Sequence, residues 1–448
     1  MSTSGAPLMI CLQSAALSLA AASGGHATAL AQAGDGAGAS RMVGSTTAQA
    51  SVDLFTRNRN ISVRQRPRPD YEALGIRAGA FLVYPKVEVA QAFNDNIYAV
   101  ATGETSDTIL HFRPEVTVES NWSQHFVSLY GRGAINRHRH ARKEDRDEFG
   151  VGGVSRLDVS RMSNLGLGAE FSRGFEPRTS PSAPVGSVRP IVFDTTSVFA
   201  VGAFTSGRIK LSSRIDLRRL DYANGIDPSG RTIAQDQRDR DVGSLLGRVD
   251  FATSPDAAVF VQIAGNRRDY DRGGSAANPA RDSQGVEVLA GADFEVSVLV
   301  RGEVAVGYIR QDFDNPLYAD AQRSGGRARI EYFASPLTTV TLGAGRTLED
   351  AVTQGAGGYV SSSASITLDH ELLRNLILSG RLTYASDRYE GIDRRDARLS
   401  ASLGATYLVN RRLGLNASLW TQKIASDGLD RDQDFTINRL SLALVTQF

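Results

Sequence analysis

The most constraining feature of this chain is a two-residue alternation of apolar and polar side chains that recurs along most of its length. In residues 440–448, three leucines and Phe448 fall on one face of an extended chain, and Ser441 and Gln447 fall on the other. Successive side chains in a strand point to opposite faces, so each such segment has one apolar and one polar face. No run keeps the 3.6-residue period of an amphipathic helix. The sequence therefore predicts a fold built almost entirely from strands.

The alternating runs begin at about Gly79, and the connections between them alternate in length. Examples of the runs are 209–218, 298–308, 327–332, 398–407 and 413–422. Tight turns are predicted near 121–123, 161–163, 205–207, 253–255, 295–297, 334–336, 371–373 and 410–411. Longer polar connections are predicted at 137–147, 176–190, 223–239, 271–283, 314–323 and 426–434. Tight turns on one side and long loops on the other are the arrangement of outer-membrane barrels.

Two classes of protein could use such strands. A soluble propeller or solenoid would keep its charges mainly in loops and on outward faces, and its repeats would have a fixed period. Here Arg and Glu lie in mid-strand opposite an apolar face, and no later segment approaches the ~20 apolar residues of a transmembrane helix. A closed barrel is the other structure that can cross a bilayer. We expect an all-β transmembrane antiparallel barrel over residues 78–448, with about 18 strands (about 16–20), short periplasmic turns and long extracellular loops.

Aromatic residues support the same fold. Rings with one wet edge are stable at the two membrane interfaces, where barrels carry aromatic girdles. Nine tyrosines lie near the ends of expected strands, and we expect them to contribute to such girdles: Tyr84, Tyr98, Tyr130, Tyr270, Tyr308, Tyr332, Tyr384, Tyr389 and Tyr407.

The N-terminal region has a different composition. Residues 8–22 form an apolar stretch of signal-peptide length, followed by small residues with cleavage candidates at 29–31 and 31–33. We interpret 1–31 as a signal peptide, although its first residues lack Lys and Arg; the alternative is a disordered tail. Cys11 lies inside it, so the exported chain would have no cysteine, which suits an oxidising periplasm. Residues 32–77 have no apolar period and are interpreted as a mobile periplasmic segment.

The polar strand faces are the candidate functional surface, because a barrel of this size can enclose an aqueous channel. A charge facing lipid near the midplane costs about 2–4 kcal/mol for Arg or Lys, so these side chains are expected to line the lumen. Their mixed charges could select among ions and polar solutes, or they could pair and brace the wall; both interpretations stay open. The predicted lumen-lining residues are Arg214, Asp216, Arg218, Arg248, Asp250, Glu287, Arg301, Glu303, Arg327, Arg329, Glu331, Arg381 and Arg398.

Other motifs carry weaker indications of chemistry. The loop 137–146 is rich in Arg and His and could bind lipopolysaccharide phosphates, or a metal through His138 and His140, but a solvated mixed-charge tip is the simpler interpretation. Asn94-Asp95-Asn96 is typical of a structural turn, with a calcium or sugar site as the alternative. No histidine lies in a recognisable catalytic motif, and we expect no enzyme activity, cofactor or metal. The net charge of +1 disfavours a nucleic-acid partner.

A family resemblance follows from the start of the barrel. Residues 66–77 form an Arg-Pro-rich lead into the apolar residues 81–85, and the box Phe93-Asn94-Asp95-Asn96-Ile97-Tyr98 comes next. This combination, with repeated Ser-Pro turns and a final Phe448, resembles the β-barrel porin families of Gram-negative bacteria. The resemblance implies an outer-membrane location and, through Phe448, recognition by the barrel insertion machinery. In that location we also expect contact with the lipid bilayer and lipopolysaccharide. Some members look associated with exopolysaccharide export, and no catalytic residues come with the family.

These observations favour a passive outer-membrane pore for ions or polar solutes. Two alternatives remain open. The barrel could export or assemble exopolysaccharide together with periplasmic export proteins, or it could be a closed structural or adhesive barrel.

Overall fold

The computed structural model describes residues 60–448 apart from 185, 273–278 and 352. The interpretation of 1–31 as a signal peptide and that of 32–59 as a mobile segment lie outside the described residues. Almost all described secondary structure is extended. The strands are β1 (Ile76–Ala78), β2 (Phe81–Asn94), β3 (Asp107–Ser120), β4 (Phe126–His138), β5 (Arg146–Ser160), β6 (Ser163–Phe175), β7 (Val192–Ser206), β8 (Ile209–Tyr222), β9 (Gly225–Ile226), β10 (Thr232–Ile233), β11 (Arg240–Ser254), β12 (Ala257–Tyr270), β13 (Ser283–Ser297), β14 (Val300–Phe313), β15 (Ala321–Ser335), β16 (Thr338–Asp350), β17 (Gly358–Leu373), β18 (Leu376–Tyr389), β19 (Arg395–Leu408), β20 (Leu413–Asp427) and β21 (Phe435–Gln447). Two short 3-10 helices, η1 (Arg142–Glu144) and η2 (Asp236–Arg238), lie in loops.

Eighteen long strands form one closed antiparallel barrel. Each strand from β2 to β21, with β9 and β10 excepted, pairs with its neighbours in sequence, and β21 pairs with β2 to close the ring. At this seam Phe448 donates its backbone N–H to the Pro85 carbonyl at 3.1 Å. The expected fold class and strand number are therefore confirmed. The role of Phe448 in membrane insertion stays a prediction. Among the described residues, no helix is long and apolar enough to span a membrane.

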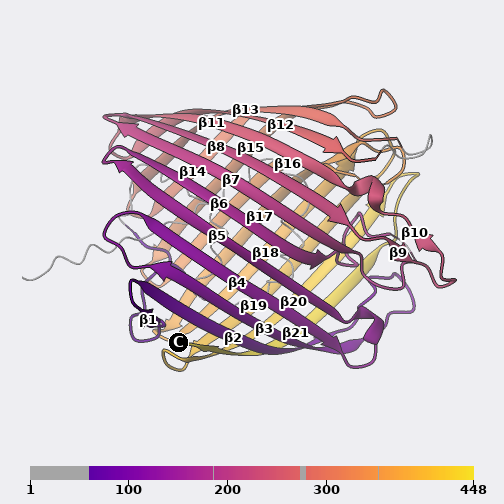
Figure 1. Cartoon of the computed structure of the whole chain (residues 1–448), viewed down its shortest axis with the longest axis horizontal. Coiled ribbons are helices and arrows are strands. Elements are labelled where there is room, and N and C mark those ends of the chain that lie inside the picture. Colours follow the sequence, from indigo (N-terminus) through magenta and orange to yellow (C-terminus); the bar gives the residue numbers. More distant parts are fainter. Residues whose placement is uncertain (1–59, 185, 273–278, 352) are drawn as a thin grey trace, which may run out of the picture.

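The two ends of the barrel differ. Tight turns gather at one end, where the C-terminal residue also lies, and long loops, including β9 and β10, gather at the other (Figure 1). Tight turns at one end and long loops at the other match the predicted arrangement, and we name the two ends periplasmic and extracellular after that prediction. Two turns, expected at 295–297 and 371–373, come slightly later, at 298–299 and 374–375. A register shift lies before each of them, between Glu295 and Ser297 and between Glu371 and Leu373. A bulge of this kind adds a residue to one strand and delays the turn.

The outward face carries the apolar side chains. Leu382, Leu403 and Leu442 are examples of side chains about half exposed on this face, and buried or half-buried polar residues alternate with them. Four tyrosines of the expected girdle face outward, namely Tyr308, Tyr332, Tyr384 and Tyr407. The expectation is wrong for Tyr84, Tyr130, Tyr270 and Tyr389, because their strand positions place them on the inward face. A tyrosine near a strand end satisfies a lumen as well as a membrane interface, so spacing alone could not separate the two.

We infer a bend of the wall at β13–β15, because glycines there allow carbonyl oxygens of the neighbouring strands to come unusually close. A Cβ atom on Gly307 would lie 1.8 Å from the Val288 carbonyl oxygen, and one on Gly302 would lie 2.5 Å from the Arg329 carbonyl oxygen. Phe260, Leu289 and Ala305 form a small buried apolar cluster at this bend. Because the wall is bent here, inward side chains from strands that are not neighbours can meet.

Candidate functional site: the lumen and its two ends

The thirteen predicted lumen residues all lie on the inward face, opposite the exposed apolar side chains. At the bend they form a buried ion-pair network. Arg248 on β11 pairs with Asp250 at 2.7 Å and with Glu303 on β14 at 2.8 Å. Arg327 on β15 pairs with the same Glu303 at 2.8 Å and donates to Gln262 on β12 at 2.9 Å. One network therefore connects four strands of the wall, β11, β12, β14 and β15.

Most of the other predicted residues also have partners. Glu331 accepts from Arg329 at 2.9 Å and from Arg301 at 2.6 Å, and Arg214 pairs with Asp216 at 2.5 Å. Arg398 pairs with Asp387 at 2.7 Å, and Arg381 donates to Thr367 at 3.1 Å. Glu287 is buried and Arg218 is half-buried on the same face. These contacts are the pairing that a bracing role requires, and their effect on ions stays a prediction.

Asp350 at the extracellular end of β16 is a network member that the sequence reasoning missed. It pairs with Arg240 on β11 at 2.9 Å and with Arg268 on β12. Alternation does not reveal this carboxylate, because it lies just beyond the part of β16 that pairs with β15.

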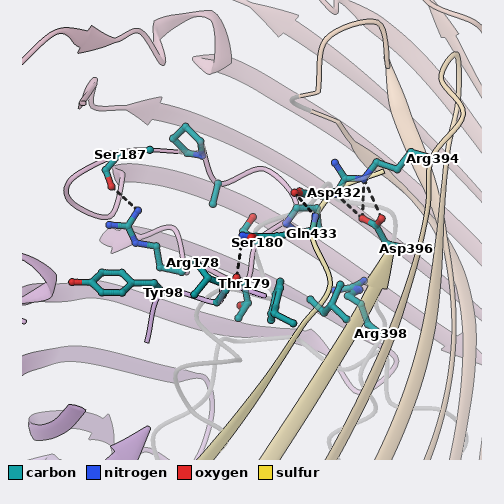
Figure 2. A pocket seen from close by; sticks show the side chains of 18 residues that line it. Tyr98, Arg178, Thr179, Ser180, Ser187, Arg394, Asp396, Arg398, Asp432 and Gln433 are labelled. Carbon is teal, nitrogen blue, oxygen red and sulfur yellow. Dashed lines mark hydrogen bonds and ion pairs between the residues drawn. The ribbon is translucent and has the colours of Figure 1, made fainter. Parts of the chain in front are cut away.

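The loop 176–191, between β6 and β7, folds across the extracellular opening. Residues of this loop, among them Arg178, Ser180 and Ser187, line a cavity of about 250 Å³ together with Tyr98 and side chains of the β19–β21 wall (Figure 2). The wall contributes Arg398, Ile424 and Phe435. Because β6 and β7 are far from β19–β21 around the ring, this loop narrows the lumen.

Two buried ion pairs hold this loop at its base. The Glu176 carboxylate accepts hydrogen bonds from both terminal guanidinium nitrogens of Arg238, at 2.7 and 2.9 Å, and both side chains are almost fully buried. The Arg238 guanidinium also lies 4.0 Å from the ring centre of Tyr222. Arg178 pairs with Glu144 of η1 at 2.7 Å. Neighbouring loops therefore fix the position of the constriction.

The wall facing the loop carries charges of both signs. Arg394 pairs with Asp396 at 2.7 Å and with Asp432 at 3.1 Å, as Figure 2 shows. Burial raises the pKa of Tyr98 above its ordinary value, so this tyrosine faces the cavity as a neutral hydroxyl. A solute that passes here meets paired charges and hydrogen-bonding groups.

The periplasmic end is also covered in part, by residues 60–72, which we call the N-terminal strap. Arg64 pairs with Asp369 at 2.6 Å, and Arg66 and Arg68 pair with Glu371 at 3.2 and 2.9 Å. Both carboxylates lie on the inward face of β17. Val63, next to these arginines, is fully buried, and its N–H donates to Thr339 at 3.1 Å.

The N-terminal strap extends across the turns. Arg301 near the β13–β14 turn donates to the Asn60 carbonyl at 3.1 Å. At the other end, Arg411 donates to the Pro69 carbonyl at 3.0 Å and Gln447 to the Tyr71 carbonyl at 3.2 Å. Residues 32–77 were expected to form a mobile periplasmic segment, and their mobility stays a prediction; the structure shows residues 60–72 in contact with the barrel. The spacing Arg64-x-Arg66-x-Arg68 matches Asp369-x-Glu371, and this match is the signal that sequence reasoning could have used.

The remaining motifs have local structural roles. The Asn94 side chain accepts a hydrogen bond from the Asn96 N–H at 2.9 Å, and the Asn96 side chain makes two hydrogen bonds with the backbone of Val100. These local bonds are those of a structural turn, as the sequence predicted. In the loop 137–146, His138 and His140 lie beside Asp145 and Asp107. Among the described residues, no group of three or more His, Cys, Asp or Glu side chains is placed to hold a metal ion. Phosphate binding by the arginines of this loop stays a prediction.

A comparison with known protein families identifies the family of this barrel. The family model described as "Putative beta-barrel porin 2" matches residues 68–448, which is most of the chain. The chain belongs to this family. The match begins within the N-terminal strap, so this porin family model includes the last part of the segment that covers the periplasmic end. The predicted resemblance is confirmed. None of the proteins with curated descriptions matches the chain in sequence.

Solved barrels resemble the chain only distantly. A vanillate-bound OpdK from Pseudomonas aeruginosa is 11% identical, with 82% of this chain and 99% of that chain covered and a TM-score of 0.43. OccK5 (OpdH) from the same organism is 10% identical, with 83% and 100% covered and a TM-score of 0.45. A mutant of its ferric enterobactin receptor PfeA is 7% identical, with 84% and 82% covered and a TM-score of 0.47.

Proposed function

We propose that this porin-family barrel is located in the bacterial outer membrane and conducts ions and small polar solutes passively. The observation that carries the proposal is the inward-folded loop 176–191, which faces a charged wall. A loop that narrows the opening, fixed by buried ion pairs, is a filter that a solid structural barrel would not need. The charged network at β11–β15 extends the polar path along the wall. Neither feature supplies a nucleophile with an oriented base, so the proposal includes no catalysis.

Single-channel recording tests the proposal. The full chain, refolded and inserted into a planar lipid bilayer, is expected to give steady ohmic currents with mild ion preference, because the lumen pairs its charges. A folded barrel that gives no current would refute the pore and favour a closed structural barrel. Brief interruptions by added soluble polysaccharide would favour export of that polymer.

A variant of the loop anchor makes the test specific to the constriction. Arg238→Gln removes a buried partner of Glu176, so the loop should become mobile and the current should become noisier and larger. Arg231→Gln is the matched control, because Arg231 lies in the same loop as Arg238, is mostly exposed, and bonds to Asp227 and Ser229 within that loop. Equal currents from both variants would contradict a constriction at loop 176–191.

A further inference from the structure

Two arginines lie directly opposite each other on the outward face of the barrel. Arg388 on β18 is the register partner of Arg395 on β19, and both side chains are exposed. The residues next to Arg388, Asp387 and Tyr389, are buried on the inward face, so Arg388 points away from the lumen. Like charges directly opposite in a sheet repel each other. Among the described residues, none forms an ion pair with Arg388.

Five other outward arginines near the extracellular ends of strands have carboxylate partners. Arg173 makes two bonds of 2.7 Å to Asp194, and Arg310 and Arg267 make bonds of 2.7 and 2.8 Å to aspartates two residues along the same strand. Arg137 and Arg219 are paired in the same way. The arginine pair at β18–β19 is therefore an exception that internal pairing does not explain.

Further donors surround this pair. Arg346 donates to Ser362 at 2.9 Å, and Arg395 donates to Ser386 at 3.1 Å; Ser362 and Ser386 are register partners between β17 and β18. Lys423 is exposed on the same face of β20, where its register partner is the outward Leu399. Asp427 is the one carboxylate in register with the pair, opposite Arg395, and the two side chains form no ion pair.

This cluster lies at the upper edge of the apolar band. Tyr384 and Leu399 are register partners four residues along their strands from the arginine pair, toward the membrane centre, and each is about half exposed. A cluster of cations beyond the edge of the apolar band, on the extracellular side of Tyr384 and Leu399, is where the phosphates of outer-leaflet lipids would lie. Arginine binds phosphate with two parallel N–H bonds, and repulsion between Arg388 and Arg395 is relieved by an anion between them.

We propose that Arg388 and Arg395, supported by Arg346 and Lys423, form a binding site for a lipid A phosphate of lipopolysaccharide. The inference rests on the proposed outer-membrane location. It assigns lipopolysaccharide contact to the outward face of β16–β20 and not to the loop 137–146.

Binding of lipid A to the full chain, refolded in detergent, tests the site. Native mass spectrometry would compare diphosphoryl lipid A with the same lipid after enzymatic removal of its phosphates. The double variant Arg388→Gln/Arg395→Gln is expected to bind diphosphoryl lipid A at least tenfold more weakly than the unchanged chain. Arg267→Gln/Arg310→Gln is the matched control, because it removes two outward arginines that already have aspartate partners. This control should bind normally.

Two results would overturn the site. One is equal affinity for the phosphorylated and dephosphorylated lipids, and the other is normal binding by the Arg388/Arg395 variant. Conductance of the same preparations separates this inference from the pore. A double variant that conducts normally and loses lipid A supports the site, whereas phosphate-dependent binding by a barrel without conductance would remove the pore alone.

Discussion

Neutralising Glu371 should loosen the N-terminal strap without altering the barrel wall. In the structure this buried carboxylate accepts from Arg68 at 2.9 Å and from Arg66 at 3.2 Å. A glutamine keeps one acceptor oxygen but loses the charge, and charged hydrogen bonds are roughly twice as strong as neutral ones. We assign about 1.5 kcal/mol to the buried Arg68 bond and about 0.5 kcal/mol to the more exposed Arg66 bond. The released state should therefore gain about 2 kcal/mol, or about thirtyfold in population.

Single-channel dwell times would measure this change. If the N-terminal strap limits current, Glu371→Gln should visit a higher-conductance state about thirtyfold more often, and deletion of 60–72 should hold that state open. Glu115→Gln is the matched control. Glu115 is an inward glutamate paired with Lys86 at 3.2 Å on the β2–β3 wall, and it has no contact with the strap. Unchanged currents from both Glu371→Gln and the deletion would refute the idea that the strap obstructs the lumen.

Two further predictions concern packing and pH. Gly307→Ala should lower the unfolding temperature measured in a heat-modifiability gel, because overpacking at this position costs about 1–3 kcal/mol. Gly247→Ala is the control and should leave that temperature unchanged, because an added Cβ meets nothing within 4 Å there. Equal unfolding temperatures for the two variants would contradict the close approach of strands at the bend. Burial, followed by the nearby Asp221, Asp271 and Asp236, raises the pKa of Asp239 above its ordinary value, to about 6. The folded loop then favours the protonated carboxyl group of Asp239. The contribution of Asp239 to the stability of the folded loop therefore falls as pH rises from about 4 to about 6. Amide exchange in 223–239, corrected for intrinsic rates, should be slower at pH 5 than at pH 7.5, and Asp239→Asn should abolish that difference.

The strand pattern predicts most of the wall because it depends on local alternation. A charge such as Arg248 or Glu303 in mid-strand can face only the lumen, so its side of the wall follows from the residues beside it. The turn positions are predicted less accurately from the sequence. A bulge before Ser297 or Leu373 adds a residue to the strand, and the alternation of apolar and polar residues does not reveal it.

The two ends of the lumen could not be predicted in the same way. The composition of 176–191 indicates a loop, but the direction in which it folds depends on Glu144 and Arg238, which belong to other loops. The Arg-Pro-rich composition of 60–72 is typical of disorder when considered alone. Its order comes from Asp369 and Glu371, about three hundred residues further along the chain, and a local pattern carries no information about such partners.

The contacts of the N-terminal strap also have a consequence for assembly. Among the described residues, the carboxylates that form ion pairs with its arginines belong to β17, and its last contacts reach Arg411 and Gln447 beside the seam. A growing barrel that has inserted only its early strands offers this segment nothing to dock on. Its burial must therefore come at the end of folding, after the slowest and most distant strand pairing has formed. Protection of residues 60–72 from protease would then report the completion of barrel folding, since it would be found only in molecules whose ring of strands has closed.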